Sequence, residues 1–592
     1  MENLHQVLLS IGFQYAQAKK FPKETRFYNS SNKKGYYTKK YRVGESGHSY
    51  SVALILPQDP HIELPYAYTY EVPDELKGKL IPHISHEGYV CYVEQMEADW
   101  NPNELITLYK AIDLQIQKTL EIASVSFIDK KKGNQELANE FVSYWAAERS
   151  LYLMSDCSRK FQYKTYAAHS LDDPCKTEFI TVGNSTSQQD ITLENDEIVS
   201  WLKQRRLTLT CDSVAGMPTF YVRVKPNQLS GITWPPESFK EVLLWLQKVD
   251  ISARNHLVYV LSSSSSKRNL VLLDIEGQYP ISIYLELNTN LRTDRLGKNS
   301  RKKGSASSVK HIALTMGSRH FCSNFTRVSV VKADRKTLQS RNKKRPQDLS
   351  KYRIALIGCG TIGGYLAHLL LRSGAGCGTS PFHLYDADTY NPQNFSRHPL
   401  TARSFGANKA EELAHDLKSS IHISKNIVGH NKNFLITEVN LRAYDIVIDA
   451  TGRPPVSKRL AFVVRSIDVA RPTLIHAFND GNGRASKVMI DKGSSCYNCM
   501  RMDKSVHFDG VDSRFSDIDL VKERHISCGN TYTSFDSAVS HVTAAIAQEA
   551  VLNSLESSPP WTYSEFVLDE RFRTGKRRVL IKQNGCSICD KK

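Results

Sequence analysis

The chain is poor in cysteine for its length, with 12 cysteines among 592 residues. A disulfide-stapled fold needs a much higher density, so these cysteines are candidates for metal ligands, nucleophiles or small buried side chains in a reducing compartment. No stretch approaches the about 18 uninterrupted apolar residues of a membrane-spanning helix. The first residues carry neither a basic region nor a small-residue cleavage site, so no export signal is expected. These absences exclude a disulfide scaffold and predict a cytoplasmic protein without a membrane partner.

The sequence also lacks repeats at solenoid spacing and an excess of charge along its whole length. The net charge is +17, but residues 292–345 hold 16 Lys or Arg and only two Asp, and the remainder is close to balanced. A globally basic nucleic-acid binder is therefore excluded. Three interpretations of segment 292–345 stay open: solvated loops, a docking surface for an acidic partner, or nucleic-acid contact, which has little support because aromatic residues are sparse there.

Three regions differ in their pattern of expected helices and strands, and each is expected to form a domain. Residues 1–150 begin with a helical pattern, continue with short strand-like runs and end in helices, which predicts an α+β domain. Residues 151–345 mix strands with at least one helix and show no catalytic signature, so a mixed α/β middle domain is expected. Residues 346–592 begin with an α/β pattern and hold most of the recognisable chemistry.

One helix of the first region is predicted in detail. Asn101 is a plausible cap for it, with Pro102 in the first turn. The apolar stripe follows a 3.6-residue period and comprises Leu105, Leu108, Ile112, Ile116 and Leu120.

A glycine turn opens the third region. Gly358, Gly360 and Gly363 form G-x-G-x-x-G between a buried strand and a helix, and a second strand ends near Asp386. The glycines permit a tight turn, the helix start presents free N–H groups to a phosphate, and the acidic residue can bind a ribose hydroxyl. This pattern predicts a nucleotide site, but it fits an NAD enzyme and an ATP enzyme alike.

The residues that follow the second strand distinguish these two uses of the turn. Asn394, Arg397 and Lys409 come just beyond strand ends, where ligands bind in a doubly wound sheet. Hydride transfer needs no basic cluster against a triphosphate. Adenylation does need one, because negative charge builds on the phosphates as pyrophosphate leaves. The cluster therefore favours ATP.

The segment resembles the ThiF/MoeB superfamily of adenylating enzymes, to which the ubiquitin-activating enzymes belong. Their pattern of GxGxxG, D-x-D, N-x-x-R and G-x-x-K-A is present in order. The resemblance implies a Rossmann-like adenylation domain that requires Mg²⁺. It further implies that Asp386 contacts ribose, and that Asn394, Arg397 and Lys409 contact the phosphates, with Arg397 and Lys409 taking part in catalysis.

The metal assignment departs from the superfamily pattern. Where the family has an aspartate that helps to hold Mg²⁺, this chain has Gly452. Metal binding would then rest on Asp449 or on another carboxylate. Asp388 is equally a ligand candidate and a turn residue.

Four cysteines fall in two CxxC pairs, Cys496 with Cys499 and Cys586 with Cys589. Four thiolates match a tetrahedral Zn²⁺ site, and a full Cys₄ shell leaves no open position for substrate, so the zinc would be structural. A redox CxxC and four unrelated buried cysteines are the alternatives. The resembled superfamily commonly carries this split pair.

Cys528 lies shortly before a helical run with an apolar stripe that includes Val539, Val542 and Ile546. A cysteine near a helix start can have a lowered pKa, and the thiolate is the nucleophile. The alternative is a loop cysteine without a role. Activating enzymes with a compact catalytic region place their thioester cysteine shortly before such a helix, so the resemblance implies that Cys528 is the first acyl acceptor.

Cys91 has His83 and His86 before it and Trp100 after it. The segment resembles ubiquitin-conjugating enzymes, whose pattern is H-P-N, a loop, G-x-x-C, then a tryptophan and a proline. The matching positions are Gly88, Cys91, Trp100 and Pro102. The His-Pro-Asn is absent; His83 stands in place of the asparagine that polarises the thioester carbonyl, and whether His83 or His86 replaces it is open.

The order of a conjugating-like domain, a middle domain and an activating-like domain resembles the fused conjugating–activating enzymes of bacterial antiphage CBASS operons. The resemblance implies that ATP and Mg²⁺ convert a protein's C-terminal carboxylate to an acyl-adenylate. Cys528 and then Cys91 would carry the acyl group to a target lysine. It also implies a cGAS-like nucleotidyltransferase as acyl donor, a cytoplasmic bacterial enzyme, and a homodimer built through the adenylation domains.

Three rival functions are compatible with parts of the sequence. A sulfur-carrier adenylyltransferase would need no Cys91 domain, and an NAD(P) oxidoreductase would leave Arg397, Lys409 and the zinc pair unexplained. A catalytically inactive adaptor would account for Gly452 and for the missing His-Pro-Asn.

Overall fold

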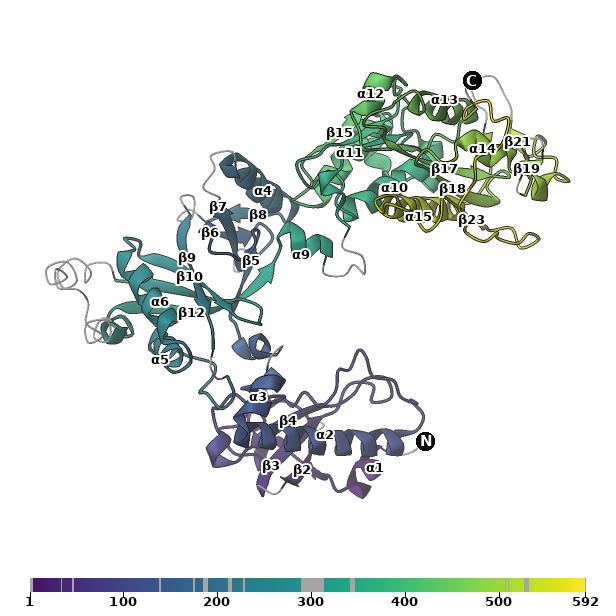
Figure 1. The fold of residues 1–592 in the computed structure, drawn as a ribbon. Helices are drawn as coiled ribbons and strands as arrows, with labels where there is room; N and C mark the ends of the chain where they lie inside the picture. Colours follow the sequence, from purple (N-terminus) through teal and green to yellow (C-terminus); the bar gives the residue numbers. More distant parts are fainter. Residues whose placement is uncertain are drawn as a thin grey trace. The chain divides into compact units, whose positions relative to one another are not determined.

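The chain forms two compact units in a computed structural model. One comprises Met1–Glu194 and Thr208–Ala333, the other Asn195–Leu207 and Asp334–Lys592 (Figure 1). The residues that the structure describes are 4–33, 35–44, 47–137, 140–173, 176–184, 190–210, 216–226, 229–288, 313–340, 347–505, 507–508, 511–525 and 532–590. Among them, no helix combines the length and the apolar character needed to cross a membrane.

The N-terminal part of the first unit contains a four-stranded antiparallel sheet in the order β1-β2-β3-β4. Its strands are β1 (Gln14–Ala16), β2 (Tyr36–Val43), β3 (His48–Ile55) and β4 (Tyr66–Glu71). Its helices are α1 (Leu4–Ser10), α2 (Leu105–Ile128) and α3 (Lys130–Glu136), with 3₁₀ turns at Ala18–Lys20, Asp74–Leu76 and Phe141–Trp145. Alternate residues of β3, including Tyr50 and Val52, share a buried core with α1 and α2, which is the α+β arrangement expected.

The predicted apolar stripe of α2 is confirmed, because all five of its residues are buried. The predicted start of this helix is wrong. The helix begins at Leu105, and Asn101 instead accepts a hydrogen bond from the main-chain N–H of Asn103 at 3.1 Å. His61 explains the difference: its Nδ1 donates to the Pro102 carbonyl at 2.7 Å, and its own carbonyl accepts from Trp100 Nε1 at 2.7 Å. These contacts hold the chain outside the helix up to Pro102.

The second sheet of this unit closes on itself, because β7 pairs with both β5 and β6. The ring runs β7-β5-β12-β11-β10-β9-β6, and β8 adds to β6. The strands are β5 (Arg149–Leu153), β6 (Gln162–Ser170), β7 (Thr177–Asn184), β8 (Leu207–Leu209), β9 (Met217–Val224), β10 (Arg268–Ile275), β11 (Ile281–Leu287) and β12 (Cys322–Lys332). Leu270 and Leu272 pack with residues of the other strands, whereas Val271 and Leu273 pack beneath α5 (Phe239–Val249) and α6 (Ile251–Ser263).

The second unit is built on a seven-stranded sheet in the order β15-β14-β13-β16-β17-β18-β23, parallel up to β17 and antiparallel beyond it. Its strands are β13 (Ile354–Ile357), β14 (Phe382–Tyr385), β15 (Ile427–His430), β16 (Ile446–Asp449), β17 (Thr473–Asp480), β18 (Ala485–Asp491) and β23 (Tyr563–Val567). The short strands β19 (His507–Phe508), β20 (Val511–Asp512), β21 (Arg524–His525) and β22 (Tyr532–Thr533) form two small pairs.

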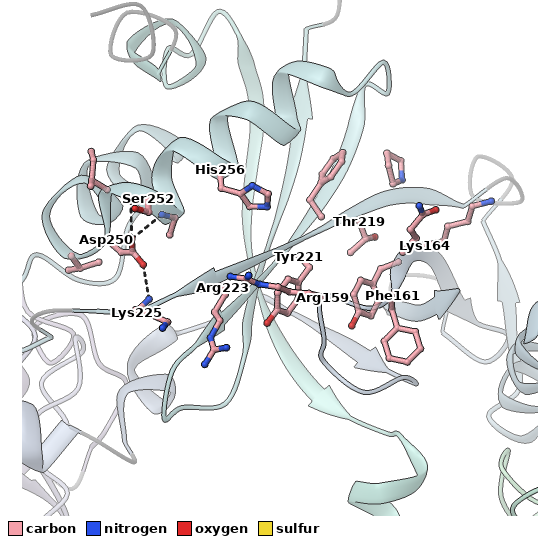
Figure 2. Close-up of a pocket in the computed structure, with 17 residues that line it drawn as sticks. Arg159, Phe161, Lys164, Thr219, Tyr221, Arg223, Lys225, Asp250, Ser252 and His256 are labelled. Carbon is pink, nitrogen blue, oxygen red and sulfur yellow. Dashed lines mark hydrogen bonds between the residues drawn. The ribbon is translucent and has the colours of Figure 1, made fainter. Parts of the chain in front are cut away.

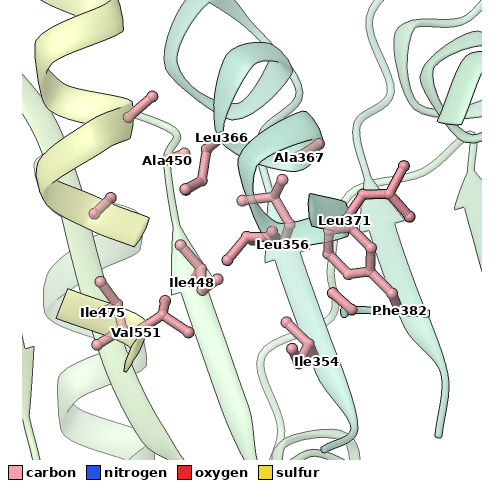
Figure 3. Close-up of a cluster of buried hydrophobic side chains, with 14 of the residues drawn as sticks. Ile354, Leu356, Leu366, Ala367, Leu371, Phe382, Ile448, Ala450, Ile475 and Val551 are labelled. Atoms are coloured by element: carbon pink, nitrogen blue, oxygen red, sulfur yellow. The ribbon is translucent and has the colours of Figure 1, made fainter. Parts of the chain in front are cut away.

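Helices cover both faces of this sheet. They are α9 (Arg335–Ser340), α10 (Thr361–Arg372), α11 (Lys409–Ser420), α12 (Glu438–Arg442), α13 (Pro454–Val464), α14 (Tyr497–Met502) and α15 (Ser537–Ser554), with 3₁₀ turns at Leu349–Lys351, Pro392–Arg397, Ala402–Ser404 and Ser513–Phe515. Helix α4 (Asp190–Gln204) contributes residues 195–204 to this unit. The strands carry continuous apolar runs that pack against α10 and α15 on one face (Figure 3) and against α13 on the other. The predicted Rossmann-like α/β fold is confirmed.

The register of the parallel strands brings the motif residues to one edge. Ile357 pairs with Tyr385 on one side and with Asp449 on the other. Gly358, Asp386 and Ala450 therefore leave the sheet side by side. Between β13 and β16 the strand order reverses direction. In open α/β sheets, the crevice at the carboxyl ends of the strands at such a reversal binds ligands.

Candidate active sites

The glycine turn between β13 and α10 is shaped by main-chain packing. Gly358 has a φ of 90°, and a Cβ there would lie 3.0 Å from the carbonyl group of Ala450. A Cβ on Gly363 would lie 1.9 Å from the Gly358 carbonyl oxygen, so only glycine fits. Gly360 has open space where its Cβ would be, and it precedes α10 without a capping side chain. The first N–H groups of α10 therefore remain available to an anion.

Asp386 sits at the end of β14 and is bound to this turn. Its carboxylate accepts hydrogen bonds from the main-chain N–H of Cys359 at 2.7 Å and of Asp388 at 2.8 Å. Lys409 is the first residue of α11, and its buried ammonium donates to Asp388 Oδ2 at 3.1 Å. The structure thus brings the predicted glycines, Asp386 and Lys409 together at one edge of the sheet.

Arg397 and Asn394 lie in the 3₁₀ turn Pro392–Arg397. Asn394 Oδ1 accepts from the main-chain N–H of Asn391 at 2.9 Å, so its side chain closes a capping box. Arg397 donates from Nη1 to the Thr533 carbonyl at 3.0 Å, and its guanidinium lies 4.3 Å from the centre of the Phe535 ring. Arg397 therefore contacts the segment just after residues 526–531.

Cys528 falls within residues 526–531 and lies outside the described residues. The structure describes the chain on either side of these residues, where β21 and β22 pair antiparallel with Arg524 opposite Thr533. Helix α15 begins at Ser537, as the sequence predicts for the helix that follows Cys528.

Asp449 ends β16 and is only 3% exposed. Its Oδ1 accepts from the N–H and the hydroxyl of Thr451 at 3.1 and 2.7 Å, and its Oδ2 accepts from Ser457 Oγ at 2.5 Å and His476 Nδ1 at 3.0 Å. Burial raises the pKa of Asp449, but these hydrogen bonds outweigh it, so the pKa lies below its usual value. Both oxygens are fully engaged within the protein.

The four CxxC cysteines converge, as the split pair predicts. Cys496 Sγ lies 3.7 Å from Cys499 Sγ and 3.6 Å from Cys586 Sγ, and Cys499 Sγ lies 3.5 Å from Cys589 Sγ. Their sulfurs all lie within 4.8 Å of one another. Zn–S bonds of about 2.3 Å at tetrahedral angles separate sulfurs by about 3.8 Å, so the cluster has the size of a Cys₄ zinc site.

Cys91 is an exposed cysteine beside a strained backbone. Its main-chain N–H donates to the His83 carbonyl at 2.8 Å, and His83 has a φ of 64°, a left-handed conformation that costs energy in a non-glycine residue. A Cβ on Gly88 would lie 2.3 Å from the Thr69 carbonyl oxygen. Glycine is thus needed three residues before Cys91, as in the predicted G-x-x-C motif, whereas His86 is exposed to solvent.

Two carboxylates that the sequence analysis missed flank His83. His83 Nε2 lies 3.4 Å from Glu136 Oε2, and Nδ1 lies 3.5 Å from Glu140 Oε2. Tyr144 accepts from the His83 N–H at 2.7 Å and donates to Glu140 at 3.2 Å. Although Cys91 is exposed overall, partial desolvation of its thiol, with added repulsion from Glu140 and Glu94, raises the pKa of this thiol. No spacing signal links residues 136–144 to Cys91; only the fold joins them.

Comparison with known proteins identifies both ends of the chain. The family model for prokaryotic E2 family B matches residues 10–154, and the ThiF family model matches residues 334–579. The ATP-dependent ubiquitin transferase-like protein Cap2 of Vibrio cholerae is 48% identical over 596 residues, covering 100% of both chains. This chain belongs to the Cap2 family. The Cap2 protein of Escherichia coli is 43% identical over 592 residues, covering 99% of each chain.

Membership in the Cap2 family confirms the prediction of a fused conjugating-like and activating-like enzyme. The ThiF match excludes the oxidoreductase interpretation, and the E2 match accounts for a domain that a sulfur-carrier adenylyltransferase would lack. Among solved structures, E. coli MccB with ATP aligns at 18% identity over 41% of this chain and 67% of that chain, with a TM-score of 0.31.

Proposed function

We propose that this chain uses ATP to activate the C-terminal carboxylate of a partner protein and ligates it to a target lysine. Cys528 and Cys91 are its successive acyl carriers. The observation that carries the proposal is that one chain joins an anion-binding glycine turn beside Asp386 and Lys409 with an exposed cysteine in an E2-family domain. A carboxylate is a poor acyl donor, and covalent catalysis divides its transfer into easier steps.

In the first step, a carboxylate oxygen of the partner attacks the α-phosphorus of ATP, and the bond to pyrophosphate breaks. The leaving group gathers negative charge, which cations and main-chain N–H groups stabilise. We assign this role to the start of α10 at Gly360 and Gly363 and to Arg397 and Lys409. Asn394 supports the phosphates, and Asp386 binds the ribose.

Mg²⁺ needs carboxylate oxygens with free lone pairs. Asp449 has none to offer, since each of its oxygens already accepts two hydrogen bonds, and Gly452 has no side chain. The Asp388 carboxylate is 73% exposed and meets Lys409 through one oxygen. We therefore place Mg²⁺ on Asp388 together with the ATP phosphates, whose charge it would neutralise, and give Asp449 the role of holding His476 and the turn after β16.

The second and third steps are acyl transfers between sulfurs. The Cys528 thiolate attacks the acyl carbon of the adenylate, and AMP leaves. The Cys91 thiolate then attacks the Cys528 thioester and releases the Cys528 thiolate. Because the pKa of the Cys91 thiol is raised, its proton must pass to a nearby base during this exchange.

The last step is attack of a lysine amine on the Cys91 thioester, which forms an isopeptide bond and releases the Cys91 thiolate. A lysine arrives as an ammonium ion and must lose a proton first. His83 lies between Glu136 and Glu140 beside Cys91. We assign to the carboxylates the attraction of the ammonium and to His83, which stands in the position of the missing asparagine, the acceptance of its proton.

The remaining assignments complete the proposal. The Cys496, Cys499, Cys586 and Cys589 cluster would hold a structural Zn²⁺ and so tie residues 586–589 to the start of α14. The acyl donor is a cGAS-like nucleotidyltransferase of the same bacterial operon, the setting is the cytoplasm during antiphage defence, and two copies pair through their adenylation domains. These assignments rest on the resemblance to the CBASS enzymes.

ATP–pyrophosphate exchange tests the activation step. Wild-type protein with Mg²⁺ and the partner's C-terminal peptide should exchange labelled pyrophosphate into ATP, and Lys409→Ala should reduce the rate by about 100-fold. Glu94→Gln, which alters no nucleotide-site residue, is the matched control. Absence of exchange in the wild type would favour the inactive adaptor instead.

A further inference from the structure

The closed sheet of the first unit carries a cavity of about 1140 Å³ that none of the preceding chemistry uses. Its walls come from the turn before β6, from β6 and β9, and from the start of α6 (Figure 2). All of these elements belong to one compact unit. We call this cavity the β9 edge pocket.

The pocket is strongly cationic. Its described lining includes Arg159, Lys164, Arg223 and Lys225, and Asp250 is the acidic residue among them. The Asp250 carboxylate caps α6 by accepting from the N–H groups of Ser252 and Ala253 at 3.0 Å, and it also accepts from the Lys225 N–H at 2.8 Å. These hydrogen bonds partly neutralise its negative charge and so weaken its repulsion of an anion in the pocket. Outside the lining, Glu276 meets Arg223 at 2.8 Å, an exposed contact that solvent screens.

The second feature is an open strand edge. β9 pairs with β10 from Thr219 to Val224, but β6 reaches it only at residues 217–219. The Val224 carbonyl accepts from the Glu276 N–H on the β10 side, whereas the Lys225 N–H points the other way to Asp250. Since the main-chain groups of successive strand residues alternate in direction, those of Tyr221 and Arg223 face away from β10. Among the described residues, no strand pairs with them there.

Aromatic walls lie beside this edge. The rings of Tyr163 and Tyr221 lie nearly parallel with centroids 6.5 Å apart, and the Phe161 ring lies 6.1 Å from the Tyr163 ring; Figure 2 shows Phe161 and Tyr221 in the pocket wall. The Tyr221 hydroxyl donates to Asp274, which fixes the ring. Apolar side chains of an extended peptide could therefore pack on these rings, and its acidic side chains could pair with the lysines and arginines that line the pocket.

We propose that the β9 edge pocket binds an acidic peptide segment of a partner protein in extended conformation. The peptide adds as a strand beside Tyr221 and Arg223 of β9, beyond residues 217–219, where β6 pairs with β9. The unpaired main-chain groups run from Tyr221 to Arg223, because the Lys225 N–H already donates to Asp250; this edge spans about 7 Å, the length of two to three strand residues. A nucleotide would also meet the cations and rings, but it has no alternating N–H and C=O groups for the main chain of Tyr221 and Arg223. The open edge therefore favours a peptide, and strand addition is an established mode of peptide recognition.

Fluorescence anisotropy with two labelled octapeptides tests the proposal on the full chain. One peptide alternates Glu and Thr, the other Lys and Thr, so that they share β-propensity and dye but differ in charge. The Glu–Thr peptide should bind at least about tenfold more tightly, with an affinity that falls as salt rises. Equal binding of the two peptides, or displacement of the acidic peptide by micromolar ATP, would overturn the assignment.

Two substitutions at one position separate charge from strand pairing. Arg223→Ala removes the cation, whereas Arg223→Pro removes the cation and the N–H that faces the pocket, a change that sheet edges tolerate. We expect Arg223→Ala to weaken binding about threefold and Arg223→Pro at least about tenfold. Equal losses would contradict strand addition. If Arg223→Pro fails to fold, amide exchange of wild-type residues 217–225 decides: the Glu–Thr peptide must protect Tyr221 and Arg223, and unchanged exchange overturns the proposal.

Discussion

The nucleotide turn and the Cys91 site differ in how they are made. At the turn, main-chain contacts set the shape, and the positions that matter lie close together along the chain: Gly358, Gly360 and Gly363 follow β13 directly. At Cys91, a left-handed His83 and two glutamates about 50 residues further along the chain make the environment. A short motif can specify the first kind of site, whereas only a folded domain assembles the second.

The two sites also differ in charge. Lys409 and Arg397 place cations at the proposed nucleotide site, and Glu136 and Glu140 place anions beside His83 at the proposed site of lysine attack. This contrast fits the proposed chemistry, in which the donor is activated as a mixed carboxylic–phosphoric anhydride and the acceptor arrives as an ammonium ion. The predictions below test the contrast, from the largest expected effect to the smallest.

Replacement of either acyl carrier should stop ligation at different points. Cys528→Ala should retain pyrophosphate exchange and lose every reducible adduct, because the adenylate then has no thiol to attack it. Cys91→Ala should accumulate the first thioester and form no isopeptide product. Intact-protein mass spectrometry with and without reductant distinguishes these states. A normal adduct on Cys528→Ala, or unimpaired product from Cys91→Ala, would remove that residue from the pathway.

The four-cysteine cluster lies in the unit that carries the glycine turn and has no counterpart among the described residues of the Cys91 domain. Elemental analysis should find about one Zn²⁺ per chain, and Cys496→Ser should lower both the zinc content and the unfolding midpoint. Cys377→Ala alters a buried cysteine outside the cluster and should leave the zinc content intact. A stably folded wild-type protein free of metal would overturn the four-cysteine site.

Much of the fold was predictable from sequence, for physical reasons that also mark where prediction ends. The apolar period of α2 and the strand–turn–helix at Gly358 are local signals, and both are confirmed. The start of α2 was predicted wrongly because His61, some 40 residues earlier, holds Trp100 and Pro102 outside the helix. The positions of Glu136 and Glu140 beside His83, and the hydrogen bond from His476 to Asp449, depend on contacts between residues distant in sequence. No spacing rule encodes such contacts.

Two glycines of one motif should respond differently to the same added methyl group. Gly363→Ala forces a Cβ against the Gly358 carbonyl, so it should destabilise the unit by about 1–3 kcal/mol and lower exchange. Gly360→Ala meets open space at an unstrained φ of −76°. It should leave the unfolding midpoint unchanged and weaken only ATP binding. Thermal unfolding and ATP titration measure the two effects; equal destabilisation would show that the space at Gly360 is not a ligand site.

The smallest expected effect is on the acidity of Cys91. Burial and then Glu140 raise the pKa of this thiol, so Glu140→Gln removes a negative charge and should lower it. The pH midpoint of iodoacetamide labelling should therefore move to lower pH, with roughly two- to fivefold faster labelling at neutral pH. Glu97→Gln, on the loop that follows Cys91, is the control and should leave the pH profile of labelling unchanged. A midpoint that moves upward in Glu140→Gln would contradict the electrostatic account.

The most direct test of the relay is the release of AMP. Purified protein with ATP, Mg²⁺ and the partner's C-terminal segment should liberate one AMP for each acyl group that reaches a thiol, and the Cys528→Ala variant should hold the nucleotide as adenylate. If the wild type never liberates AMP under these conditions, ATP does not drive acyl transfer in this chain, and the assignment of both cysteines fails with it.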